Sequence, residues 1–199
     1  LSKTFRIGFW RKKVRAVKNV NFEVRRGEIF GLVGPNGAGK TTTMKMLTGL
    51  IFPDDGHVEL FGQDASHTAN RRKLGYLPEE PYFYEHLSAT ELLHYYGALH
   101  GMSREQVDGR VDELLELVGL EDVPDRPLRK FSKGMRQRAG IAQALVNDPE
   151  LVILDEPQSG LDPIGRKEVR DLIFELREEG KTVIFSSHIL VDVEAACDR

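Results

Sequence analysis

The stretch "GLVGPNGAGKTTTMKML", residues 31 to 47, decides the fold, because it joins a strand pattern to a helix pattern through a glycine-rich bend. The apolar run "EIFGLV" that leads into it is typical of a buried strand. Residues 40 to 50 contain no helix breaker before Gly49, which predicts a helix. Between the two, Gly34 to Thr41 fits the phosphate-binding loop pattern G-x-x-x-x-G-K-S/T. An ordinary glycine turn is the alternative, and the flanking strand and helix favour the phosphate loop.

The residue types of this loop suit a chain of phosphates. Glycines let the backbone bend so that successive N–H groups point inward at an anion. The helix that follows adds roughly half a positive charge at its N-terminus. Lys40 supplies a full charge for the outer phosphates, and the Thr41 hydroxyl can ligate Mg²⁺. We therefore predict a phosphate site built from Gly34, Pro35, Asn36, Gly37, Ala38, Gly39, Lys40 and Thr41.

A second motif, "LVILDE" at residues 151 to 156, ends a predicted buried strand on two adjacent carboxylates. Neighbouring side chains on a strand face opposite ways, so the two carboxylates can take different roles. Asp155 can hold Mg²⁺ through a water, and Glu156 can face the attacking water as general base. Alone, an apolar run that ends in two carboxylates is as often a strand that simply ends at the protein surface as a catalytic motif. Beside a phosphate loop it indicates a hydrolytic site.

The remaining patterns predict an α/β layered core interrupted by helices. Ser88, Ser103 with Gln106, and Ser132 can each cap a helix between residues 80 and 147. We expect one domain of 199 residues, apparently truncated at both ends, with a catalytic core from residues 1–78 and 148–199 and a helical subdomain from residues 79–147. The segments with strand character are "AVKNVNFEV" at 16 to 24, "HVELFG" at 57 to 62, "KLGYLP" at 73 to 78, "ELVILDE" at 150 to 156 and "KTVIFSS" at 181 to 187.

Charge and composition limit the classes of function. The chain has 28 Lys and Arg against 31 Asp and Glu, a net charge of −3, which argues against a dedicated nucleic-acid binder. The single Cys197 excludes an internal disulfide framework and favours a reducing cytosol. No apolar stretch approaches the roughly 20 residues of a membrane helix, so we expect any membrane role to be played through another chain.

Four further segments carry a resemblance to a known family. They are "FSKGMRQR" at residues 131 to 138, "SGLD" at residues 159 to 162, His188 after "IFSS", and Glu79 in "GYLPEE". With these segments the chain resembles the ATP-binding cassette (ABC) ATPases, in which a Q-loop, a signature motif, a D-loop and a switch histidine follow the phosphate loop, in the order that Glu79, residues 131–138, residues 159–162 and His188 have here. The resemblance covers essentially the whole chain. It implies a P-loop NTPase (RecA-like) core with an antiparallel β subdomain and an inserted helical subdomain, and ATP with Mg²⁺ as the bound species.

The resemblance also implies that one chain holds an incomplete site. In the family two cassettes meet head to tail and sandwich two ATP molecules, each phosphate loop facing the partner's signature motif. Ser132 would cap a helix whose N-terminus points at the partner's γ-phosphate, and Gly134 would allow close approach. Ser159, Gly160, Leu161 and Asp162 would touch the partner across the interface.

Other roles follow from the same resemblance. Thr42 would lie near the α-phosphate, His188 would contact the γ-phosphate and sense its loss, and Thr41, Asp155 and Glu79 would serve the metal. An aromatic near the N-terminus stacks on adenine in the family. Phe5 fits this position by pattern, and Phe9 and Trp10 are alternative candidates. The alternative role for these aromatics is hydrophobic cover of the first hairpin.

Lys133, Met135 and Glu79 depart from the usual glycine, glutamine and glutamine of the family. "SKGM" is nevertheless similar to a variant of ABC-2 type exporter ATPases. The expected function is therefore the ATP-hydrolysing subunit of an exporter, working with a second ABC chain, as a homodimer, and with a separate transmembrane permease at the cytoplasmic face of the cell membrane, without nucleic acid. The alternatives are a soluble ABC ATPase of DNA repair, chromosome organisation or translation, and a regulatory nucleotide binder, which would be expected to lack the base that Glu156 provides.

Overall fold

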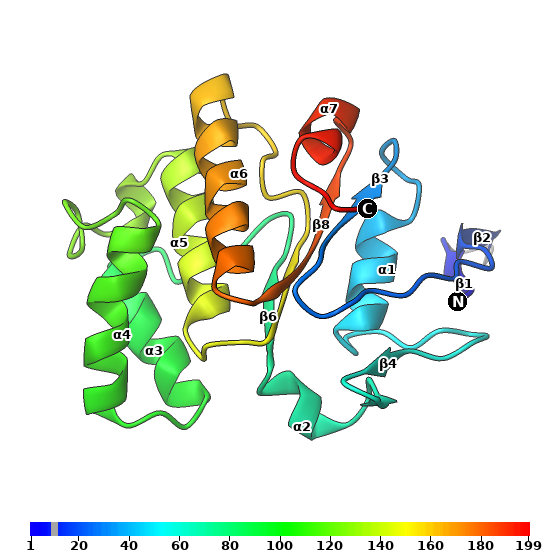
Figure 1. Ribbon diagram of the computed structural model, residues 1–199, viewed down its shortest axis with the longest axis horizontal. Coiled ribbons are helices and arrows are strands. Elements are labelled where there is room, and N and C mark those ends of the chain that lie inside the picture. Colours follow the sequence, from blue (N-terminus) through cyan, green and yellow to red (C-terminus); the bar gives the residue numbers. More distant parts are fainter. Residues whose placement is uncertain (9–11) are drawn as a thin grey trace.

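The computed structural model of the chain describes residues 1–8 and 12–199. Its strands and helices are arranged around a central four-stranded sheet (Figure 1). They are β1 (Lys3–Ile7), β2 (Lys12–Val17), β3 (Ile29–Val33), α1 (Lys40–Leu47), β4 (Glu59–Leu60), β5 (Gln63–Asp64), α2 (Thr68–Arg71), β6 (Leu74–Leu77), α3 (Ala89–Leu99), α4 (Arg104–Leu117), the 3₁₀ turn η1 (Leu128–Lys130), α5 (Lys133–Leu145), β7 (Leu151–Leu154), α6 (Pro163–Glu178), β8 (Thr182–Ser187) and α7 (Leu190–Glu194).

The central sheet has the strand order β3-β8-β7-β6, and every neighbouring pair is parallel. Parallel strands need crossover connections, and helices supply them on both faces of the sheet. The α/β fold class predicted from the sequence is therefore confirmed. Because all four strands run the same way, the segments that follow β3, β8, β7 and β6 leave the sheet at one edge.

Alternate residues of the central strands face two separate hydrophobic clusters. Val152 and Leu154 of β7 face the cluster that contains α3 to α6, whereas Leu151 and Ile153 face the cluster that contains α1. Each fully buried aliphatic side chain stabilises the fold by roughly 1.5–3 kcal/mol. Helices α1 and α5 therefore cover opposite faces of the same sheet.

The helical segment between β6 and β7 begins its helices where the sequence predicts. Ser88 and Ser103 form capping boxes with Glu91 and Gln106, and the Ser132 side chain accepts a hydrogen bond from Met135 N. In Figure 1 the helices α3, α4 and α5 lie on the side of the sheet away from β1 and β2. None of the helices described here is long and apolar enough to cross a membrane.

The strand expected at residues 16–24 is wrong beyond its first two residues. The strand β2 ends at Val17, and residues 18–28 form no regular element. Asn19 lies in the left-handed region with φ 48°, a conformation that interrupts a strand. The predicted strand at 57–62 is confirmed only as the two-residue β4.

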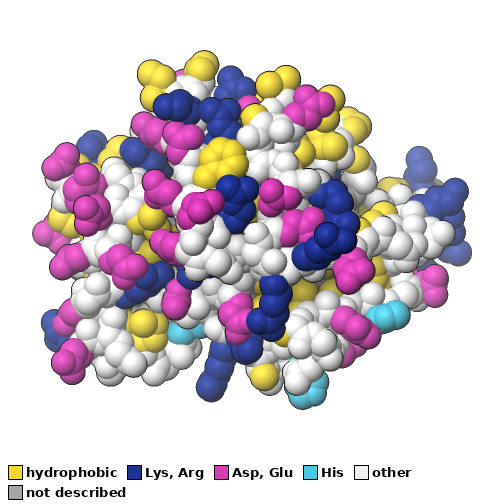
Figure 2. Space-filling view, viewed as in Figure 1, with side chains coloured by type: hydrophobic (Ala, Val, Ile, Leu, Met, Phe, Trp, Pro, Cys, Tyr) yellow, Lys and Arg dark blue, Asp and Glu magenta, His cyan; other side chains and the backbone are white. Residues whose placement is uncertain are grey.

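Strands β1 and β2 form a separate antiparallel hairpin that carries many of the cations. Lys3, Arg6, Lys12, Lys13 and Arg15 all lie on it. Figure 2 shows Lys and Arg side chains at that edge of the molecule, whereas Asp and Glu side chains are spread over the helical side. The net negative charge of the chain is therefore unevenly distributed.

Candidate functional site

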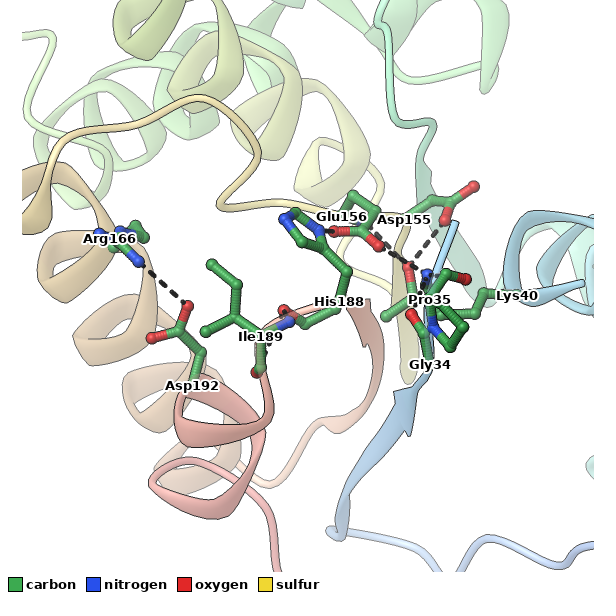
Figure 3. A network of polar contacts seen from close by, with 11 residues as sticks. Gly34, Pro35, Lys40, Asp155, Glu156, Arg166, His188, Ile189 and Asp192 are labelled. Atoms are coloured by element: carbon green, nitrogen blue, oxygen red, sulfur yellow. Dashed lines mark hydrogen bonds and ion pairs between the residues drawn. The ribbon is translucent and has the colours of Figure 1, made fainter. Parts of the chain in front are cut away.

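Three segments that carry predicted site residues meet at the carboxyl edge of the central sheet. The phosphate loop follows β3, the two carboxylates follow β7, and His188 follows β8, which lies between the other two strands. Ligand sites in open parallel sheets form at this edge, outside the strand ends. The close-up in Figure 3 shows Lys40, Glu156 and His188 pointing toward one another there. Residues separated by more than 140 positions in the sequence thus share one site.

The phosphate loop bends through glycines in conformations that other residues avoid. Gly37 and Gly39 have φ values of 83° and 93°, and a Cβ on Gly39 would lie 2.3 Å from the carbonyl oxygen of Ala16. Gly39 is the N-cap of α1, and no side chain caps this helix end. The first-turn N–H groups of α1 are therefore available to an anion.

Lys40 turns back over the loop. Its Nζ donates to the carbonyl oxygens of Gly34 at 2.7 Å and Pro35 at 3.3 Å, and lies 3.0 Å from Glu156 Oε1. The Lys40 and Glu156 side chains are only 9% and 6% exposed. The lysine charge is thus neutralised inside the chain, at the place where the phosphates of a nucleotide would need it.

Glu156 is held from both sides. Oε2 accepts a hydrogen bond from His188 Nδ1 at 2.8 Å, which fixes the proton of a neutral imidazole on Nδ1. Oε1 makes the ion pair with Lys40, but without hydrogen-bond geometry, and it has no hydrogen-bond donor among the described residues. Glu156 also has a positive φ of 51°, which is uncommon outside glycine. The Glu156 carboxylate is therefore held in place, and its Oε1 can still accept a hydrogen bond from a water.

Asp155 is fully buried and bound to a residue that the sequence analysis did not single out. Ser186 Oγ donates to Asp155 Oδ1 at 2.7 Å and accepts from Glu156 N at 2.9 Å. The only sequence signal for Ser186 is its place as a polar residue at the end of the apolar run of β8. Asp155 Oδ2 has no partner within the described part of the chain, although a buried carboxylate oxygen normally has one. This orphan oxygen fits a metal-bound water.

The metal residues predicted from the sequence are only partly assembled. Thr41 lies in the first turn of α1, and Asp155 follows β7. Glu79 lies two residues beyond β6 and is exposed. Burial raises the pKa of Tyr76, and the charges of Asp155 and Glu79 raise it further, so its hydroxyl stays protonated. Across residues 1–8 and 12–199 no group of three or more His, Cys, Asp or Glu is arranged as a metal site, so the magnesium assignment stays a prediction.

The predicted signature motif and D-loop form a second polar surface. Ser132 is exposed, and its Oγ accepts from Met135 N at 3.2 Å as the N-cap of α5. Asp162 Oδ1 accepts from Gly165 N at 2.9 Å as the N-cap of α6. A Cβ on Gly160 would lie 2.2 Å from Lys133 Nζ, so the lysine side chain lies over the D-loop. The two motifs therefore touch within one chain, and α5 covers the face of the sheet opposite to α1.

The adenine position stays a prediction. Phe5 lies on β1 opposite Val14 of β2, with Lys3 Nζ 5.8 Å from its ring centre. The alternatives Phe9 and Trp10 lie outside the described residues. The hairpin nevertheless adjoins the phosphate loop, because Gly39 packs against Ala16.

Comparison with known proteins agrees with this arrangement. The family described as ABC transporter matches residues 17–159, which include the phosphate loop, the start of α5 and the carboxylates after β7. An uncharacterised ABC transporter ATP-binding protein of Synechocystis is 49% identical over the whole chain and 57% of its own length. A bacitracin transport ATP-binding protein of Bacillus licheniformis is 46% identical over 93% of this chain and 60% of its own length. A lantibiotic transport ATP-binding protein of Streptococcus pyogenes is 43% identical over 92% and 77%.

Solved structures give the same result. A dimeric bacterial ABC transporter cassette superposes with a TM-score of 0.88 at 28% identity, over 98% of this chain and 88% of its own. A dimeric ATP-binding cassette in a post-hydrolysis state with ADP and Pi superposes with a TM-score of 0.86, also at 28% identity, over 96% and 87%. The P-loop NTPase fold predicted from the sequence is confirmed. The chain spans less than two thirds of the length of the Synechocystis and bacitracin relatives.

Proposed function

This chain belongs to the ABC transporter family, and on that premise we propose that it binds and hydrolyses ATP in a site shared by two chains and so powers an exporter. One observation carries the proposal. Lys40, Glu156 and His188 converge at the carboxyl edge of the sheet, with Nζ–Oε1 3.0 Å and Nδ1–Oε2 2.8 Å. A cation for phosphate and a positioned carboxylate for water are what hydrolysis of a phosphoanhydride requires.

The chemistry of the half-site follows from these contacts. The arriving phosphates compete with Glu156 for Lys40, because a polyanion attracts the ammonium more strongly than one carboxylate. Glu156 is then free to accept a proton from the attacking water through Oε1. His188 keeps the carboxylate in place and presents its other ring nitrogen toward the γ-phosphate. When bound, Mg²⁺ would neutralise charge on the β- and γ-oxygens, with Thr41 and the buried Asp155 as its holders and Glu79 beside them.

The second half of the site comes from a partner chain in this proposal. The Ser132 hydroxyl and the first turn of α5 supply hydrogen-bond donors, and α5 packs in a different hydrophobic cluster from α1, the helix that follows the phosphate loop. A second copy, arranged head to tail, would bring this helix end to the γ-phosphate. The dimeric cassettes with which the chain superposes support this arrangement.

The exporter assignment rests on the relatives. Two of them are named for bacitracin transport and lantibiotic transport, and both are more than 40% identical to this chain. We infer that the chain acts at the cytoplasmic face of the cell membrane, docked to a separate transmembrane permease, and that the two ATPase chains are identical.

Complementation between two inactive variants of the full-length protein tests the shared site. Lys40→Ala removes the phosphate cation, and Ser132→Asp puts a carboxylate where the partner's γ-phosphate belongs. Each variant alone is expected to lose turnover by about 10²-fold or more. A mixed dimer holds one site with both native residues. A one-to-one mixture should therefore recover about one quarter of the unmodified rate, since half of randomly paired dimers are mixed and each has one intact site.

The design separates chemistry from folding. Asp is as good an N-cap as Ser, so Ser132→Asp keeps the helix start, and Ser132→Thr is the matched control that keeps the hydroxyl. A mixture no faster than its two components measured separately would contradict the shared site. Unmodified protein without ATPase activity would contradict the proposed function itself.

A further inference from the structure

Three polar residues that the proposed hydrolysis does not use, Gln158, Arg166 and Asp192, lie in contact next to the D-loop, residues 159–162. Gln158 is 5% exposed, and its Nε2 donates to the carbonyl oxygen of Arg166 at 3.0 Å. This bond ties the residue before the D-loop to the first turn of α6. The base of the D-loop is therefore coupled to the start of α6.

The side chain of Arg166 continues from that point toward α7. Its Nη1 lies 3.8 Å from Asp192 Oδ2, and the two side chains are 31% and 12% exposed. Figure 3 shows this pair on the other side of His188 from the phosphate loop. Arg166 Nε and Asp192 Oδ2 are buried and have no hydrogen-bond partner among the described residues. An unpaired buried charge destabilises a protein strongly, so each of these groups depends on the other.

Asp192 lies four residues after His188, which holds Glu156 at 2.8 Å. The chain between them is short and restrained, because Ile189 N donates to Ser187 Oγ at 3.0 Å. Three contacts, Gln158–Arg166, Arg166–Asp192 and His188–Glu156, are therefore linked by two short chain segments, residues 156–158 and 188–192, into one ring. We call Gln158, Arg166 and Asp192 the D-loop clasp.

We propose that Arg166 and Asp192 are positioning residues that hold His188 against Glu156 and transmit movement of the D-loop to it. The inference rests on the proposed function, in which the D-loop touches the partner chain. Arg166 N donates to Asp162 O at 3.0 Å, so a partner that presses on the D-loop moves Arg166 with it. At 3.8 Å the pair is an ion contact, and an approach of about 1 Å makes it a hydrogen bond. Dimer closure can thus tighten the clasp and fix the switch histidine.

Asp192→Asn in the full-length protein tests the clasp by removing the charge and keeping the shape. Through misplacement of His188 we expect kcat to fall about tenfold, with KM for ATP changed by about twofold or less. In a His188→Ala background, assayed at high enzyme concentration, the same change should have no further effect, because the residue through which it acts is gone. Asp192→Glu, which keeps the carboxylate, should retain most of the rate.

The matched control is Asp171→Asn on α6. Asp171 also pairs with a cation, Lys167 Nζ at 3.7 Å, but both side chains are well exposed and outside the clasp. The kcat of the Asp171→Asn variant should equal that of the unmodified protein. The inference would be overturned if kcat were unchanged in Asp192→Asn, or if Asp192→Asn lowered kcat by a further tenfold in the His188→Ala background. Either result would leave ATP hydrolysis by the unmodified protein unaffected.

Amide hydrogen exchange of the nucleotide-free, full-length protein gives a readout that needs no turnover. Asp192→Asn should speed exchange in α7 and at Ala195, whose N–H bonds to Val191 O at 3.1 Å, and leave the middle of α6 unaltered. Unaltered exchange in α7 would overturn the clasp even if the unmodified protein failed to hydrolyse ATP. The inference and the proposed function therefore fail by different results.

Discussion

Helices α1 and α5 both begin at a small residue followed by a lysine, yet the two helix ends are completed in different ways. At α1 the lysine, Lys40, is buried and paired with Glu156 at 3.0 Å. At α5 the lysine, Lys133, is exposed, and the described part of the chain offers it no ion-pair partner. Neither first turn contains an acidic residue. The lysine charge is thus compensated within the chain at α1, which we call the compensated end, and left unpaired among the described residues at α5, which we call the open end.

The two regions therefore have different roles. Substitutions at the compensated end act on buried charges and should change the chemistry itself. Substitutions at the open end act on exposed groups and should leave ATP binding by one chain intact.

Glu156→Gln at the compensated end should reduce turnover by about 10³-fold, because an amide cannot accept the proton of the attacking water. ATP should bind at least as tightly as before, since Lys40 no longer has a carboxylate to hold it. The side chains have the same shape, and His188 Nδ1 can still donate to the amide oxygen. With ATP and Mg²⁺ the variant should accumulate as a dimer in size-exclusion chromatography. Turnover near that of the unmodified protein would remove Glu156 as the base.

The sequence predicts those parts of the site that depend on neighbours along the chain. The phosphate loop and the carboxylates are contiguous motifs. The helix starts at Ser88, Ser103 and Ser132 are each fixed by a hydrogen bond to the serine side chain from the backbone N–H three residues later. The strand expected at residues 16–24 is wrong because one residue, Asn19, takes a left-handed conformation that periodicity does not reveal.

Contacts between distant segments could not be predicted in this way. The Ser186 hydroxyl donates to Asp155, which precedes it by 31 residues in the sequence. Arg166 of α6 forms an ion pair with Asp192 of α7. No local pattern distinguishes these residues from ordinary polar ones, since their roles appear only when β7, β8, α6 and α7 are packed together. The motifs of the candidate site were therefore predictable from the sequence, and the contacts that support their residues were not.

Ser132→Ala at the open end should have an intermediate effect with two separable parts. Loss of the N-cap bond to Met135 should lower the free energy of unfolding by about 1 kcal/mol. Loss of the hydroxyl that faces the partner's phosphate should lower turnover by about tenfold, the effect of one hydrogen bond to a charged group. ATP affinity at protein concentrations that keep the chain monomeric should not change. A weaker monomer affinity, measured by calorimetry, would contradict the division between the two helix ends.

Glu79→Gln should have the smallest effect, because Glu79 is exposed and lies at the entry to the helical segment, between the two regions. If the carboxylate assists Mg²⁺, the amide should raise the magnesium concentration for half-maximal turnover by about threefold, the size of one exposed charge contact. The maximal rate should stay within about twofold, since an amide can still orient water. Titration of MgCl₂ at fixed ATP measures both quantities, with Glu80→Gln as the matched control on the neighbouring exposed carboxylate. An equal shift in the two variants would assign the effect to general surface charge and remove Glu79 from the metal site.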